Sequence, residues 1–139
     1  MTGLTKLSIT TGSLSSIGFG VWHFFVPKLW NWSSYIDAEA TELVLAVRAI
    51  NLFFSLSLVL FGLANMLVAY KAPQEKFSLL VLLSASAILW ASRTIMQIFY
   101  PQGSQQPMLQ YSLLVVFILV FACFAVAIRL MWINDQGSN

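Results

Sequence analysis

Four long apolar segments, separated by short breaks that contain proline, constrain the fold of this chain more than any other feature. A helix needs roughly 20 mainly apolar residues to cross the hydrocarbon core of a bilayer. None of the segments alternates apolar and polar residues as a half-buried strand does. We therefore predict an all-α integral membrane protein, in which residues 1–139 form a single bundle of four transmembrane helices. The predicted helices cover about residues 7–26, 41–70, 77–100 and 108–133.

The composition of the chain agrees with a lipid environment. Of the 139 residues, 59% are hydrophobic and only 9% are charged, whereas a soluble domain has roughly 25% charged residues. The net charge of +2 is scattered, with no basic run, no zinc-like cysteine spacing and no glycine-rich phosphate loop. We therefore expect no nucleic-acid partner. Cys123 is the only cysteine and lies in an apolar run, where a thiol is usually inert.

Basic residues in the breaks predict how the chain is oriented. Lys6, Lys71, Lys76 and Arg129 fall on one side of a four-helix count, and Lys28 falls on the other side with three acidic residues. Short cytoplasmic loops are enriched in lysine and arginine. We therefore expect both termini to be cytoplasmic, in a multi-pass protein of the cell inner (plasma) membrane. The first segment lacks the small-residue cleavage site of a signal peptide, so we expect a retained helix.

Small and polar side chains share one face of the first predicted helix. Ser8, Gly12, Ser16 and Gly20 recur every four residues, and such small residues let helices approach closely in lipid. At about 100° per residue, the only histidine, His23, falls within about 20° of Gly12 and Ser16. We therefore expect His23 to point into the bundle.

Two further predicted helices carry arginines in apolar surroundings. Arg48 and Asn51 lie on the second helix, and Arg93 and Gln97 lie on the third. At about 1.5 Å per residue, His23 and both arginines lie within about 5–10 Å of the outer boundary. A charge at this depth faces the bundle interior, finds a partner or snorkels to the surface. We therefore expect these five residues to form one polar layer.

Two interpretations of this polar layer stay open. In the first, the arginines pair with Asp37, Glu39 or Glu42, and His23 is a satisfied core residue. In the second, two permanently charged guanidinium groups form a pocket near the outer leaflet that attracts an anion or an electron-rich head group. His23 would then donate a hydrogen bond or shuttle a proton. One histidine without a membrane-embedded acid argues against a metal site, and a haem would need a further ligand or an open site.

The chain also carries motifs that resemble a known group of proteins. These are His23-Phe24-x-x-Pro27-x-x-Trp30-x-Trp32, then Arg48 and Asn51, then Trp90-x-x-Arg93-x-x-x-Gln97. This pattern resembles small, largely uncharacterised bacterial four-helix membrane proteins, which in turn resemble the DoxX-like class. The resemblance spans nearly the whole chain. It implies a bacterial cytoplasmic membrane and a four-helix bundle in which His23, Arg48, Asn51, Arg93 and Gln97 are the recurring polar positions. DoxX-like proteins have been linked to quinone-coupled redox complexes, so the resemblance suggests a quinone or a small anion as ligand.

Two functions follow from these features. The first is a membrane protein whose cationic pocket binds a quinone, a lipid head group or a small anion, in support of a redox complex. The second is a non-catalytic accessory or scaffold subunit, because a small chain with a stripe of small residues suits contact with other membrane spans or self-association. A transporter or channel is less favoured, since no pair of broken helices marks a midplane site. The sequence leaves open whether any reaction is catalysed.

Overall fold

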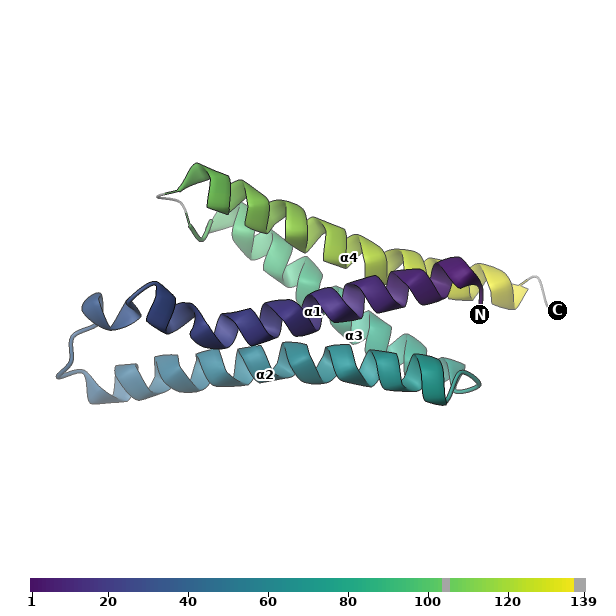
Figure 1. The fold of residues 1–139 in the computed structure, drawn as a ribbon, viewed down its shortest axis with the longest axis horizontal. Coiled ribbons are helices and arrows are strands. Elements are labelled where there is room, and N and C mark those ends of the chain that lie inside the picture. The colour runs from purple at the N-terminus through teal and green to yellow at the C-terminus, as the bar shows by residue number, and fades with distance from the viewer. Residues whose placement is uncertain (104–105, 137–139) are drawn as a thin grey trace.

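The fold is entirely helical in the part of the chain that the structure describes. A computed structural model describes residues 1–103 and 106–136, without the side chains of residues 135 and 136. Its elements are α1 (Gly3–Leu29), a short 3-10 helix η1 (Trp32–Ser34), α2 (Thr41–Lys71), α3 (Lys76–Phe99) and α4 (Pro107–Gln136). Figure 1 shows that α1 begins at the end of the bundle where α4 finishes and α2 turns into α3. The two other connections lie at the opposite end.

Three of the helices are long and apolar enough to cross a membrane. They are α2, α3 and the residues Pro107–Asn134 of α4. The fourth helix, α1, has 27 residues, which is a length of about 40 Å, but its serine, threonine and glycine residues make it less apolar. Large apolar side chains also cover the outside of the bundle, as Phe77, Phe99 and Met108 illustrate. Both observations agree with a membrane environment for this chain.

The first helix is longer than predicted because it continues through Pro27. Proline has no N–H, so the carbonyl of His23 lacks its usual helical donor four residues later. The helix nevertheless reaches Leu29, and the N–H of Trp30 still donates to the carbonyl of Val26 over 2.9 Å. Asn31 then takes a left-handed conformation with φ of 47°, which turns the chain into η1. This turn brings Trp32 back toward the end of the bundle.

The small residues of α1 lie in close contact with α2 and α4. A Cβ atom on Gly20 would lie 2.8 Å from the backbone oxygen of Ser55, and one on Gly12 would lie 3.1 Å from the ring of Phe124. From the other side, a Cβ atom on Gly62 of α2 would lie 2.8 Å from the backbone oxygen of Ser13. The predicted stripe of small residues is therefore used within the chain.

Buried hydrogen bonds between helices complete the core. The indole N–H of Trp90 in α3 donates to the hydroxyl of Ser16 in α1 over 2.7 Å. The amide of Asn65 in α2 donates to the hydroxyl of Ser86 in α3, also over 2.7 Å. Because lipid offers no competing partners, such bonds fix which helix faces lie together. They lock α1 and α2 to α3 below the site described next.

Candidate functional site

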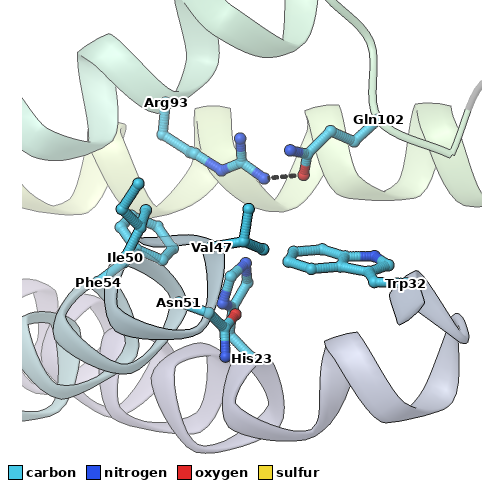
Figure 2. Close-up of a pocket in the computed structure, with 8 residues that line it drawn as sticks. All are labelled: His23, Trp32, Val47, Ile50, Asn51, Phe54, Arg93 and Gln102. Atoms are coloured by element: carbon cyan, nitrogen blue, oxygen red, sulfur yellow. Dashed lines mark hydrogen bonds between the residues drawn. The ribbon is translucent and has the colours of Figure 1, made fainter. Parts of the chain in front are cut away.

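A cavity of about 240 Å³ lies between the two helix pairs, near the end that carries η1. Its walls come from α1, η1, α2, α3 and the loop after α3, so no single segment forms it. Figure 2 shows the polar groups on opposite walls, with Arg93 across the cavity from His23 and Asn51. The lining residues are His23, Trp32, Val47, Ile50, Asn51, Phe54, Arg93 and Gln102.

His23 is buried, and its hydrogen bond indicates which ring nitrogen carries the proton. Its Nδ1 lies 3.2 Å from the hydroxyl oxygen of Ser55. That hydroxyl already donates its only hydrogen to the carbonyl of Asn51 over 2.7 Å, so toward His23 it can only accept. The Nδ1 atom therefore carries the hydrogen, and Nε2 of the neutral ring is an acceptor. Figure 2 shows the imidazole pointing from α1 into the cavity.

Aromatic rings hold this imidazole in place. The ring of Phe54 meets it edge-on with centroids 4.7 Å apart, and the ring of Phe19 lies 5.7 Å away. Phe19 in turn packs edge-on against Trp90 and Phe117. Packing of this kind restricts the ring to one orientation, so a ligand in the cavity would meet a preset nitrogen atom.

Asn51 offers an unused acceptor beside the histidine. Its side chain is only 8% exposed, and its Oδ1 atom has no hydrogen-bond partner among the described residues. A buried amide oxygen without a partner costs free energy, about 1–3 kcal/mol. A ligand or a water molecule in the cavity that donates a hydrogen bond would remove this cost.

Arg93 is the only charged residue in the cavity wall, and it is half-buried. One terminal nitrogen donates to the side-chain oxygen of Gln102, and the guanidinium lies 4.8 Å from the ring centroid of Phe117. Its Nε atom has no hydrogen-bond partner among the described residues. No carboxylate of those residues lies within 4.0 Å of this cation. The interpretation in which Arg93 pairs with Asp37, Glu39 or Glu42 therefore does not describe the structure.

Gln97 lies behind the cavity wall and holds the loop after α3. It is buried, its amide donates to the carbonyls of Gln102 and Gln110, and its oxygen accepts from the N–H of Gln102. These bonds place Gln102 beside Arg93. Gln97 thus has a supporting position, and it is absent from the lining.

Arg48 is the predicted site residue that the structure places elsewhere. It is exposed and lines a second cavity of about 490 Å³ together with Lys28. The buried face of α2 runs through Asn51, Ser55, Leu58 and Gly62. Arg48 continues this face by one turn, but it lies near the last turn of α1, where its side chain is exposed beside Pro27 and Lys28. The expected layer of five residues therefore becomes a cavity with His23, Asn51 and Arg93.

Several lining residues were not predicted. Val47, Ile50 and Phe54 follow one another at helical spacings of three and four residues, so the helical periodicity of α2 places them on one face. Trp32 was named only as part of the motif that begins at His23, and no sequence pattern pointed to Gln102, which lies in a loop. The described residues contain no group of three His, Cys, Asp or Glu side chains that could hold a metal ion.

No protein-family model matches this chain, and no curated protein or solved structure is significantly similar to it. The resemblance to DoxX-like proteins stays a prediction.

Proposed function

We propose that this protein is a four-span protein of the bacterial plasma membrane whose cavity around His23, Asn51 and Arg93 binds the ring of a quinone. The observation that carries this proposal is a ring-sized, mainly apolar space with hydrogen-bonding groups on two opposite walls. A quinone has a similar distribution of properties, because its flat apolar ring carries an oxygen at each of two opposite edges, as a carbonyl or, when the ring is reduced, as a hydroxyl group that can also donate. Its isoprenoid tail would lie in the surrounding lipid.

Membrane placement follows from helix length and charge. In the proposal α1 is the fourth span, because it lies beside α2 and α4 along its length. Lys6, Lys71 and Lys76 lie at one end of the bundle, which makes this end cytoplasmic by the positive-inside rule. The cavity then lies near the outer leaflet, at the end that carries η1.

One wall donates hydrogen bonds and the other accepts them, which suits a quinone, above all in its reduced form, better than a free anion. The guanidinium of Arg93 supplies N–H donors on one wall, with Nε still unpaired. On the other wall, Nε2 of His23 and Oδ1 of Asn51 are acceptors that fit the hydroxyl group of a reduced quinone, whereas a small anion would be repelled by them. The remaining walls are Trp32, Val47, Ile50 and Phe54, which match the faces of a ring.

The volume of the cavity sets a limit on what it encloses. Pockets for drug-sized ligands measure about 300–1,000 Å³, and this one measures about 240 Å³. It therefore takes a head group and leaves the rest of an amphiphile outside. The stripe of small residues on α1 packs against α2 and α4 within the chain, which leaves the small size of the chain as the observation that favours a scaffold role.

The test compares two substitutions of the same kind. The full chain in lipid nanodiscs is titrated with a decyl-substituted benzoquinone, and binding is followed by quenching of tryptophan fluorescence. Arg93→Gln should weaken binding about 10- to 100-fold, because a hydrogen bond to a charged group contributes about 1.5–3 kcal/mol. Arg48→Gln removes the same charge outside the cavity and should change the affinity less than twofold.

Three results would count against the proposal. Equal weakening by both substitutions would indicate a general effect of charge. No weakening by Arg93→Gln, in protein whose circular dichroism is unchanged, would remove the guanidinium from the site. Displacement of the quinone by millimolar inorganic phosphate would point to an anion site instead.

A further inference from the structure

We propose that the second cavity, at the end of α1, binds the phosphate group of an anionic phospholipid through Lys28 and Arg48. This cavity shares Trp32 and Val47 with the wall of the quinone cavity, but its charged residues are different and the proposal does not depend on quinone binding. The cavity measures about 490 Å³ and lies between the last turn of α1, the segment around η1 and the start of α2. Its volume falls within the range of about 300–1,000 Å³ that small-molecule sites occupy.

The charges in this cavity have one sign. Lys28 and Arg48 are the only charged residues in its wall. Within the described ranges, neither has a carboxylate within 4.0 Å. In the same loop, the carboxylate of Asp37 accepts from the backbone N–H of Glu39. Two uncompensated cations therefore face a shared space.

The remaining walls are apolar apart from Ser33 and suit the upper part of a lipid. Pro27, Ile36, Val44 and Val47 present aliphatic surface, and Trp32 presents its indole. A soluble anion such as free phosphate would gain nothing from these walls. An anionic phospholipid would place its phosphate between the cations and the first part of its acyl chains against the aliphatic side chains.

The position of the cavity along the helices agrees with this occupant. Lys28 lies in the last turn of α1, and Arg48 lies about two turns after the start of α2. Exposed aromatic residues such as Tyr35 surround this end, as is typical of the interface at which lipid head groups lie. A zwitterionic lipid would add an ammonium group, for which the wall offers no carboxylate. The charges therefore favour a lipid with a net negative head group.

The experiment counts bound lipids. The full chain is released into mild detergent from nanodiscs that contain equal amounts of phosphatidylglycerol and phosphatidylcholine, and retained lipids are identified by native mass spectrometry. We expect one retained phosphatidylglycerol in preference to phosphatidylcholine. Each basic side chain near a membrane surface favours anionic lipid about fivefold, so Lys28→Gln with Arg48→Gln should reduce this preference about 30-fold.

Control variants keep the result interpretable. Lys6→Gln with Lys71→Gln removes two charges at the opposite end of the bundle and should leave the preference unchanged. Arg48→Lys keeps the charge and should retain most of it. Both target residues are exposed, so folding is not at risk, and circular dichroism checks this.

The proposal is overturned if wild-type protein retains both lipids equally, or if the control pair lowers the preference as much as the test pair. It is also overturned if millimolar glycerol phosphate removes the bound phosphatidylglycerol, since the site would then recognise a soluble phosphate group without the lipid chains.

Discussion

Gly20 offers the sharpest test of the packing on which the quinone cavity depends. It lies one turn before His23 on α1, where the helix packs closely against α2. A Cβ atom there would lie 2.8 Å from the backbone oxygen of Ser55, 2.9 Å from Cγ2 of Val59 and 3.0 Å from Cβ of Leu58. Two of these atoms belong to backbone or to the rigid base of a side chain, so they cannot move aside alone. Gly20→Ala should therefore push the two helices apart.

The magnitude follows from two opposing terms. Overpacking a tight interface costs about 1–3 kcal/mol. Replacing glycine by alanine inside a helix returns about 1 kcal/mol of helix propensity. Gly18 provides the matched control, because a Cβ atom there meets nothing within 4 Å, and Gly18→Ala gains the propensity term alone. The free energies of unfolding of the two variants should therefore differ by about 1–3 kcal/mol, with Gly20→Ala the less stable.

Equilibrium unfolding in mixed micelles with increasing sodium dodecyl sulfate, followed by circular dichroism, measures this difference. The same separation of helices should lengthen the 3.2 Å contact between His23 and Ser55, so Gly20→Ala should also weaken quinone binding. If Gly20→Ala proves as stable as Gly18→Ala, α1 does not approach α2 as described. The cavity that rests on this contact would then have no support.

Two further predictions concern the histidine and the topology. Because His23 is the only histidine, nitrogen-15 NMR of histidine-labelled protein reports on this residue alone. We expect the tautomer with the hydrogen on Nδ1, and Ser55→Ala should remove this preference. A wild-type signal from the other tautomer would refute the assigned hydrogen bond. In a Cys123→Ser background, the topology is tested with a membrane-impermeant maleimide added outside intact cells. Ser33→Cys should react with it and Gln74→Cys should not. The reverse pattern would show the opposite orientation.

The chain itself carried enough information for the helices and for part of the site. Apolar runs predicted four helices, and the described helices agree with these segments within a few residues at most ends. Helical phase placed His23 on the inner face, and the structure buries it against Ser55. Both results depend on local periodicity, which a sequence displays directly. The end of α1 was predicted at residue 26, before Pro27, yet the helix continues through this proline to Leu29.

Sequence by itself determined that this chain needs an apolar solvent, that it forms long helices, and that His23, Asn51 and Arg93 carry polar groups into them. Only the tertiary structure decided that these three share a cavity while Arg48 belongs to another. The difference depends on where α1 ends relative to α2, and on the loops that bring Trp32 and Gln102 to the cavity wall. Those contacts join residues far apart in the chain. They depend on how the helices pack against one another, and the spacing of residues within one segment does not predict that packing.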